Sequence, residues 1–351
     1  MPITLSIIIA TFNSEKTLRL VLQSIKKQTI PKEKIEIILV DGGSHDKTFA
    51  IAKRFHCKVI NNPKTEPVYA KFLGYLQAKG KYIMYLDHDE VMENNKSIAL
   101  KIETFSADKK IKAVIGSGYK NPSGYPFINN YINEFGDPFS FFMYRLSKDS
   151  RYFIATMKER FSVLRDEKDF VIFDMSHAKT LPLIELIAGG SMFDRIYFSK
   201  TFPESKRKKD LLPHFFYLLL QNYPYIAITK NDALLHYSSD IISSYLNKIR
   251  WRVKNNIYFV ANMGESGFSG RQNFSNSRFR YKKYLFIPYA YTIVFCSLDS
   301  IYLVITRKDI RYFIHLPLCL FAASLILYHS ILKACGYRPQ LKSYDEKKVI
   351  E

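Results

Sequence analysis

Short apolar runs alternate with longer helical segments through the N-terminal third of the chain, and this alternation restricts the fold more than any other feature. Residues 5–10 (LSIIIA), 35–40 (IEIILV) and 82–86 (YIMYL) read as strands buried on both faces, and residues 58–61 and 113–116 add two shorter strands. Such repetition predicts an α/β fold in which a mostly parallel sheet carries helices on both faces. The intervening helices are expected at residues 14–27, 46–55 and 68–79.

Each of the three long strands ends in a polar cluster. Thr11 and Asn13 follow the first strand, Asp41 opens the turn after the second, and Asp87 and Asp89 follow the third. Ligands of open parallel sheets bind beyond the carboxyl ends of the strands. The three clusters are therefore expected to converge on one binding edge.

The sequence Asp87-His88-Asp89 places two carboxylates two residues apart in a turn. Such a pair can share the charge of a divalent cation and leave coordination positions for phosphate oxygens, which suits Mg²⁺ or Mn²⁺. Acidic residues also gather at strand-to-loop turns for solubility and capping, so the motif alone does not establish a metal site. Asp87 and Asp89 are candidate ligands.

Four segments follow one another in this half of the chain: residues 10–13 (ATFN), 40–48 (VDGGSHDKT), 70–74 (AKFLG) and 86–89 (LDHD). Their combination resembles the donor half of family-2 glycosyltransferases with the GT-A fold. The resemblance is close over residues 4–95 and looser over residues 186–255. It implies an enzyme that takes a sugar from a nucleotide-diphosphate sugar.

The resemblance also implies roles for single residues at the nucleotide. Ala10, Thr11 and Asn13 would line the nucleotide pocket, and Asp41 would contact the base or the ribose. Gly43, in the turn after Asp41, would let the backbone approach the ligand closely.

At the phosphates the resemblance implies a second group of residues. Lys71 would lie near the diphosphate, and Asp87 near the ribose, with His88 between the two aspartates of the donor loop. Asp89 would hold the cation that bridges the two phosphates.

Two positions depart from the family pattern. The family often has proline where Ala10 stands and a second aspartate where Gly42 stands. Both changes leave a backbone role possible but weaken the expected base contacts. Without the resemblance, Asp41 reads as a turn residue and Lys71 as part of a solvated helix face.

Residues 189–195, 202–204 and 209–212 look like the acceptor half of the same family, with Gly190 as a possible acceptor contact. There the family places a general base next to a glutamate, and Lys209 here replaces that glutamate. Asp210 then stands at the base position of an inverting transfer, in which a carboxylate takes the proton of the attacking hydroxyl. Glu204 is the reserve candidate. Alternatively, Asp210 only caps the helix that follows it.

Further along, His236 matches a histidine that the family often places after this region, where it could bind the metal or a phosphate, or simply be structural. Residues 241–263 have an apolar stripe flanked by lysine and arginine, which predicts either an ordinary surface helix or one in a membrane interface. Within it, Arg250 and Trp251 belong to a weak likeness of the QxxRW element and are possible acceptor or phosphate contacts.

Two apolar segments near the C-terminus predict a membrane hairpin. Residues 284–306 carry Asp299 as their only charge, and residues 312–332 have His315 and His329 as their only ionisable groups besides tyrosine. At a rise of ~1.5 Å per residue, each could cross a hydrocarbon layer of ~30 Å. Basic residues on both flanks favour the cytoplasmic side. Buried core helices, or a re-entrant or interfacial pair, are the alternatives.

Composition bounds the remaining choices. The net charge of +20 fits anionic lipid or a phosphorylated substrate, and no nucleic-acid-binding motif accompanies it. The four cysteines form no CxxC pair, which favours a reducing compartment for the soluble part. The N-terminus enters a strand directly, so no secretory signal is expected.

These observations predict a GT-A domain at residues 1–240, with a nucleotide-sugar half at 1–118 and an acceptor half at 119–240. A basic interfacial helix and linker would follow at 241–283, a membrane hairpin at 284–333 and a polar tail at 334–351. The expected protein is a metal-assisted, membrane-bound glycosyltransferase with a lipid-linked or membrane-surface acceptor. A non-catalytic basic membrane protein is one alternative. The other is a haloacid-dehalogenase-like phosphohydrolase that uses Asp87 as nucleophile and Asp89 as acid/base.

Overall fold

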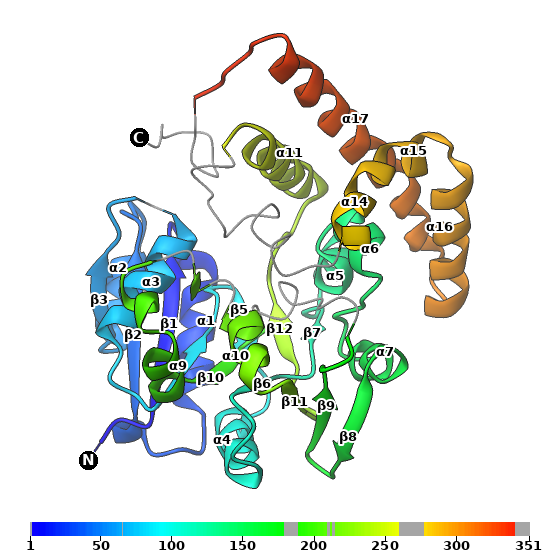
Figure 1. Cartoon of the computed structure of the whole chain (residues 1–351). Coiled ribbons are helices and arrows are strands. Elements are labelled where there is room, and N and C mark those ends of the chain that lie inside the picture. Colours follow the sequence, from blue (N-terminus) through cyan, green and yellow to red (C-terminus); the bar gives the residue numbers. More distant parts are fainter. Residues whose placement is uncertain are drawn as a thin grey trace. The chain divides into compact units, whose positions relative to one another are not determined.

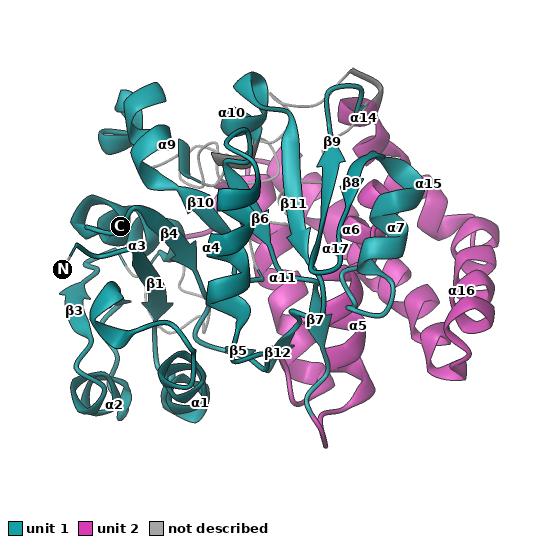
Figure 2. Cartoon of the chain, turned by 90° about the horizontal axis from the view of Figure 1, so that it is seen from below, with its two compact units in different colours: residues 1–122, 148–237 teal, residues 123–147, 238–351 magenta. Residues whose placement is uncertain are grey.

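The computed structural model describes residues 2–64, 66–178, 189–208, 211–212, 215–259 and 277–340 (Figure 1). The chain forms two compact units, which are coloured separately in Figure 2. Unit 1 contains residues 1–122 and 148–237, and unit 2 contains residues 123–147 and 238–351. Residues 123–147, which the sequence analysis assigned to the acceptor half, thus belong with the C-terminal segment, because their helices pack on it.

Unit 1 is built on a nine-stranded sheet with the strand order β3-β2-β1-β4-β10-β6-β11-β9-β8. Strands β3, β2, β1 and β4 are parallel to one another, and β6 is parallel to β11. Strand β10 is antiparallel to β4 and β6, and β9 is antiparallel to β11 and β8. The parallel half coincides with the strands predicted from the apolar runs. The strands are β1 (Leu5–Thr11), β2 (Ile35–Asp41), β3 (Lys58–Asn61), β4 (Tyr82–Tyr85), β6 (Ala113–Ile115), β8 (Ser162–Asp166), β9 (Phe170–Asp174), β10 (Met192–Asp194) and β11 (Tyr225–Thr229).

Three further strands form a small second sheet in the order β5-β12-β7, with β5 at Glu90–Met92, β12 at Leu234–His236 and β7 at Tyr119–Lys120. In this sheet β12 runs antiparallel to β5, with His236 opposite Glu90. The pairing brings the segment after β4 together with residues far along the chain.

The helices of unit 1 include all three that the sequence predicted between the first strands. Helix α1 buries Leu18, Val21, Leu22 and Ile25 against the sheet, which is the spacing expected of an amphipathic helix on a core. The helices are α1 (Glu15–Lys26), η1 (Lys32–Lys34), α2 (Thr48–Arg54), α3 (Pro67–Gln77), α4 (Ser97–Ala107), α7 (Phe153–Arg160), α9 (Arg195–Thr201), η2 (Pro203–Lys206) and α10 (Phe215–Asn222).

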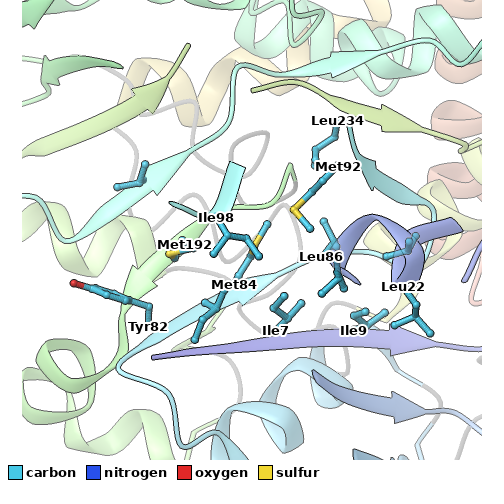
Figure 3. Packing of buried hydrophobic residues seen from close by; sticks show 14 of the residues in the cluster. Ile7, Ile9, Leu22, Tyr82, Met84, Leu86, Met92, Ile98, Met192 and Leu234 are labelled. Atoms are coloured by element: carbon cyan, nitrogen blue, oxygen red, sulfur yellow. The ribbon is translucent and has the colours of Figure 1, made fainter. Parts of the chain in front are cut away.

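The core of unit 1 lies between the parallel strands and α1, and Figure 3 shows part of it. Ile7, Ile9, Leu22, Met84 and Leu86 are all completely buried there. Each fully buried aliphatic side chain contributes ~1.5–3 kcal/mol relative to an exposed one. This core holds β1, β2 and β4 together beneath the loops at their carboxyl ends.

Unit 2 is helical. Helix α11 covers the central part of the predicted segment 241–263, whose last four residues lie outside the described chain. The apolar segment 284–306 is not straight: it contains α15 and α16, and the helix pair is bent by 87° around Ile293. The helices are α5 (Phe127–Phe135), α6 (Pro138–Tyr144), α11 (Ile242–Tyr258), α14 (Ser277–Lys282), η6 (Lys283–Leu285), α15 (Phe286–Tyr291), α16 (Val294–Arg307), η7 (Ile310–Ile314) and α17 (His315–Ala334).

Among the described residues, one continuous helix, residues 310–334, is long and apolar enough to cross a membrane, and the bent pair would be a second candidate if it formed one span. Polar side chains tie the C-terminal helices to α5 and α6. Arg307 donates to the buried Glu134 over 2.7 Å, and the Tyr312 hydroxyl donates to the same carboxylate. Arg145 pairs with Asp299. The described C-terminal helices therefore pack with α5 and α6 in unit 2.

Candidate active site

The loops after β1 and β2 are joined by a dense set of hydrogen bonds centred on Asp41. Its carboxylate accepts from the Thr11 hydroxyl over 2.9 Å and from the Ser44 hydroxyl over 2.6 Å. The backbone N–H groups of Gly43 and Ser44 donate to the same carboxylate over 3.1 and 2.8 Å. Parallel pairing places Thr11 directly opposite Asp41, so the register of the two strands builds this cluster.

Asn13 ties the same two loops together from the other side. Its backbone N–H donates to the Ser44 hydroxyl over 2.8 Å, and its side-chain oxygen accepts from the His45 N–H over 2.9 Å. Asn13 has φ of 48° and Gly43 has φ of 88°, which are left-handed conformations that asparagine and glycine tolerate. The nucleotide contacts predicted for Asn13, Asp41 and Gly43 would thus come from a preorganised pair of turns.

The loop after β4 carries the acidic motif. The Lys71 ammonium, on α3, lies 3.0 Å from the Asp87 carboxylate, whose side chain is 38% exposed. Burial lowers the pKa of Lys71, but the charge and hydrogen bond of Asp87, with Glu90 and Asp89 nearby, raise it on balance. Lys71 is therefore held as a cation at this edge. His88 lies 3.3 Å from the Thr17 hydroxyl of α1.

Asp89 and His236 face each other across the small sheet. The Asp89 carboxylate and His236 Nε2 are 3.6 Å apart, and the Tyr237 N–H donates to the Asp89 carbonyl over 2.9 Å. The ring of Tyr119 stacks on His236 with centroids 4.7 Å apart. The β5–β12 pairing thus delivers a histidine to the second aspartate of the motif.

The spacing of the Asp89–His236 pair suits a divalent cation. Two neighbouring ligands of an octahedral Mg²⁺ lie ~3 Å apart when each is ~2.1 Å from the ion, so the Asp89–His236 separation of 3.6 Å is near that value. Within the described part of the chain, no group of three or more His, Cys, Asp or Glu side chains could hold a metal. The residues present fit a cation that takes its remaining ligands from phosphate oxygens and water.

No role was predicted for Glu90 from the sequence, although its carboxylate accepts three hydrogen bonds in this loop. It is completely buried, and its Oε1 accepts from the Tyr119 hydroxyl over 2.5 Å and from the Gly189 N–H over 3.0 Å. Its Oε2 accepts from the Asp87 N–H over 3.0 Å. Burial and the charge of Asp87 raise the pKa of Glu90, while His236 and the hydrogen bonds oppose the rise. Its position next to the motif was the only signal in the sequence.

The predicted Gly189–Gly190 turn lies in this neighbourhood. Both glycines have positive φ, 90° and 63°. A Cβ on Gly190 would come within 2.8 Å of Met84 Cε, so the Met84 side chain would have to shift to admit it. Gly189 is linked to the donor loop through Glu90. The turn therefore brings the segment before β10 against the donor site.

The other predicted site residues separate into three groups. Ala10 is the residue before Thr11 on β1, paired with Val40. Glu204 is exposed in η2, and Asp210 lies outside the described residues. Arg250 and Trp251 are on α11 in unit 2, where Arg250 stacks on Phe321 with 5.1 Å between its guanidinium carbon and the ring centroid.

A mixed sheet whose parallel strands β1, β2 and β4 end in loops that combine tight polar turns, a lysine and an Asp-x-Asp motif is typical of the GT-A fold. Residues 6–167 match the family model "Glycosyl transferase family 2", so this part of the chain is similar to family-2 glycosyltransferases. The match includes every donor-loop residue discussed above.

Individual relatives agree with this classification. The chain is 31% identical over 124 residues to the poly(ribitol-phosphate) β-N-acetylglucosaminyltransferase TarS of Staphylococcus aureus. It is 35% identical over 118 residues to a dolichyl N-acetyl-α-D-glucosaminyl phosphate 3-β-D-2,3-diacetamido-2,3-dideoxy-β-D-glucuronosyltransferase of Methanococcus voltae. These matches cover 32% and 30% of this chain, and only 22% and 35% of the relatives.

A solved structure supports the fold over nearly the whole chain. The mannosyltransferase PcManGT of Pyrobaculum calidifontis, in complex with GDP-Man and Mn²⁺, superimposes with a TM-score of 0.53 at 12% identity. The match covers 94% of this chain and 90% of that one. At this identity the likeness establishes the fold alone, which is the predicted GT-A fold.

Proposed function

We propose that this chain transfers a sugar, with inversion, from a nucleotide-diphosphate sugar to an acceptor at a membrane surface. The observation that carries the proposal is the Asp89–His236 pair beside Lys71 and Asp87, at the edge where β1, β2 and β4 end. This edge offers carboxylates for a cation and a lysine for phosphate oxygens. A family-2 domain match over residues 6–167 supports the same chemistry.

The loops after β1 and β2 would hold the nucleoside. Ala10, Thr11 and Asn13 line the predicted pocket, and the Asp41 carboxylate keeps the turns closed through four hydrogen bonds. Because Asp41 already accepts these bonds, its contribution is to shape the backbone at the ligand. Base and ribose would then be contacted by the loop atoms that Asp41 positions.

The loop after β4, together with Lys71 of α3, would hold the diphosphate. Lys71 can leave Asp87 for a phosphate oxygen, and Asp87, with His88 beside it, then becomes available to the ribose. Asp89 and His236 would hold Mg²⁺ or Mn²⁺, and PcManGT, which shares the fold, is bound to Mn²⁺. Such an ion neutralises charge that develops on a departing diphosphate.

For the transfer itself we propose Asp210 as the general base, with Glu204 in reserve. The acceptor hydroxyl attacks the anomeric carbon as the bond to the diphosphate breaks, and the hydroxyl proton passes to the carboxylate. The assignment rests on the sequence, where Asp210 follows the segment resembling the family's acceptor half. Gly190 would line the acceptor side through its close approach to β4.

We propose a lipid-linked or membrane-surface acceptor, with the catalytic unit on the cytoplasmic face. The names of the two relatives include a ribitol-phosphate polymer and a dolichyl-phosphate lipid, and both acceptors are anionic. A net charge of +20 and the apolar C-terminal helices fit such a surface. Arg250 and Trp251, on the basic helix α11, remain candidates for contacts with the acceptor.

The two alternatives receive less support. The Asp87–Asp89 motif lies inside the family-2 match, which disfavours a haloacid-dehalogenase-like phosphohydrolase. A non-catalytic membrane protein would not need the hydrogen bonds that link the loops after β1 and β2. Measured nucleotide binding distinguishes it from the proposed enzyme.

The first experiment is thermal-shift binding of the purified chain to UDP, GDP, CDP and dTDP, with and without Mn²⁺. A nucleotide at a hundredfold excess over its dissociation constant should add ~2.7 kcal/mol of stability. We expect one nucleotide to stabilise the chain only with Mn²⁺, and we expect Asp89→Ala to lose that shift. Asp169→Ala, at an exposed aspartate before β9, is the matched control and should keep it.

If no nucleotide stabilises the chain under any condition, the donor-site proposal fails and the non-catalytic alternative becomes the better one. If Asp89→Ala retains the full metal-dependent shift, the cation is held elsewhere. The nucleotide that succeeds identifies the class of donor.

A further inference from the structure

Helix α16 has the opposite burial pattern to helix α1. The side chains that it buries are Cys296, Ser300 and Leu303, two of them small and weakly polar. The opposite side, here called the outer face of α16, has exposed fractions of 43–68%. The outer face consists of Val294, Phe295, Leu298, Ile301, Tyr302 and Ile305.

The spacing shows that this exposure forms one surface. Val294, Leu298, Ile301 and Ile305 recur at intervals of four, three and four residues, so they form a single stripe along the helix. Of the 25 exposed large hydrophobic side chains in the described chain, 17 lie between residues 281 and 337. Large contiguous apolar patches of this kind mark interaction sites.

We infer that the outer face of α16 lies in the headgroup region of an anionic membrane, with the helix parallel to the surface, so that unit 2 attaches to the membrane without α16 crossing it. This inference deepens the membrane-surface acceptor of the proposed function. It does not depend on the donor site, which belongs to unit 1.

The dimensions and ties of α16 favour this orientation over a span. Its 14 residues extend ~21 Å, which is less than the ~30 Å of a hydrocarbon core. The 87° bend at Ile293 prevents α15 from extending it in a straight line. Arg307 and Asp299 on its inner side are paired with Glu134 and Arg145 of the helices beneath, which hold it against unit 2.

The charges around the outer face favour an anionic membrane as the surface that covers it. Residues 277–340 contain nine lysines and arginines but only two aspartates, so this apolar segment carries a net charge of +7. Arg280, Lys308 and Arg311 are exposed beside the two ends of the α15–α16 pair. Exposed tyrosines, among them Tyr302 and Tyr328, add the amphipathic rings that favour membrane–water interfaces. Protein interfaces tend to exclude lysine, whereas anionic headgroups attract it.

The test is co-sedimentation of the full chain with vesicles of 70% phosphatidylcholine and 30% phosphatidylglycerol, compared with pure phosphatidylcholine. Variants Leu298→Glu and Ile305→Glu place a charge on the outer face at positions 57% and 68% exposed, where water already reaches the side chain. Leu164→Glu, 47% exposed on β8 of unit 1, is the matched control.

We expect wild type and Leu164→Glu to bind the anionic vesicles and to be released by high salt more easily than a spanning protein. Each outer-face variant should bind about tenfold more weakly, because one apolar contact is replaced by a charge. All four proteins should keep the nucleotide- and metal-dependent thermal shift of the wild type, whatever that shift is.

Three results would overturn the inference. The outer-face variants could bind vesicles as well as the wild type, which would place the contact elsewhere. The protein could resist extraction at alkaline pH in every variant, which would show that a spanning segment, and not the outer face of α16, holds unit 2 on the membrane. The wild type could be a dimer without lipid and the variants monomers, which would make a second copy the occupant. A failure of nucleotide binding alone would affect only the donor-site proposal.

Discussion

Helices α1 and α16 have similar lengths and opposite patterns. Helix α1 buries leucine, valine and isoleucine and presents its charged side chains to water, as a surface helix of a soluble domain does. Helix α16 buries a cysteine, a serine and a leucine and presents its larger apolar side chains outward. A helix is stabilised by what covers its apolar side. Unit 1 itself buries the apolar face of α1, whereas unit 2 leaves the apolar outer face of α16 exposed.

The same contrast holds for buried charges. In unit 1 the buried Glu90 organises the donor loop, and in unit 2 the buried Glu134 ties the C-terminal helices to α5. Both units thus use interior carboxylates, but the carboxylate of unit 1 lies in the proposed ligand site. Four predictions test this comparison.

The largest effect is expected from Arg307→Met, which leaves the completely buried Glu134 without its ionic partner. Removing one member of a buried pair costs ~3–5 kcal/mol of the free energy of unfolding. Trp251 is the only tryptophan and lies on α11 of unit 2, so denaturant unfolding followed by its fluorescence reports on that unit. Arg311→Met, at a guanidinium 64% exposed, should cost under ~1 kcal/mol. Equal effects of the two changes would contradict the structural role of Glu134.

The next effect is expected in the core of unit 1. Leu22→Ala removes a completely buried side chain from α1 and should cost ~2–5 kcal/mol. Leu20→Ala, on the same helix at 39% exposure, should cost far less and controls for helix propensity. Unfolding followed by far-UV circular dichroism measures both. A similar loss from the two variants would mean that α1 is not held by its inner face.

A smaller effect is expected from Glu90→Gln. The amide can still accept from Tyr119 and Gly189, but its NH₂ would then face the Asp87 N–H, and two donors would meet. Leaving a buried donor unsatisfied costs ~1–3 kcal/mol, and the displaced loop should weaken metal-dependent nucleotide binding. The control is Glu93→Gln, at a carboxylate 50% exposed beside Lys120.

Thermal shifts with and without nucleotide and Mn²⁺ separate the two parts of this prediction. A Glu90→Gln protein that is less stable but binds nucleotide normally would show that Glu90 only supports the fold. Normal stability with weak binding would instead show that Glu90 acts mainly by positioning the loop after β4 for the nucleotide.

The donor half of the fold could be predicted because its signals are local. Each buried strand is a continuous apolar run, and each polar cluster follows its strand within a few residues, so the order β1, β2, β4 and the edge they share could be inferred from the sequence. The family resemblance supplied the roles of single residues there, and those roles stay predictions.

What the sequence did not reveal depends on distant partners or on a backbone angle. Glu90 meets Tyr119 and Gly189, 29 and 99 positions away, and only the folded sheet brings them together. The break between α15 and α16 occurs at Ile293, which has φ of 62°, an unusual angle for a β-branched residue. Composition alone made residues 284–306 look like one straight helix, since hydropathy averages over such a bend.

The smallest effect is expected on the outer face of α16. Leu298→Ala, on the outer face of α16, should change the free energy of unfolding by less than ~0.5 kcal/mol in lipid-free buffer, because its side chain is already 57% exposed. Leu303→Ala, one turn further along and completely buried, should cost ~2–5 kcal/mol on the same helix. Trp251 fluorescence during denaturation measures both in unit 2. If Leu298→Ala were as costly as Leu303→Ala in the absence of lipid, the outer face would already be covered by protein, and α16 would be a helix like α1.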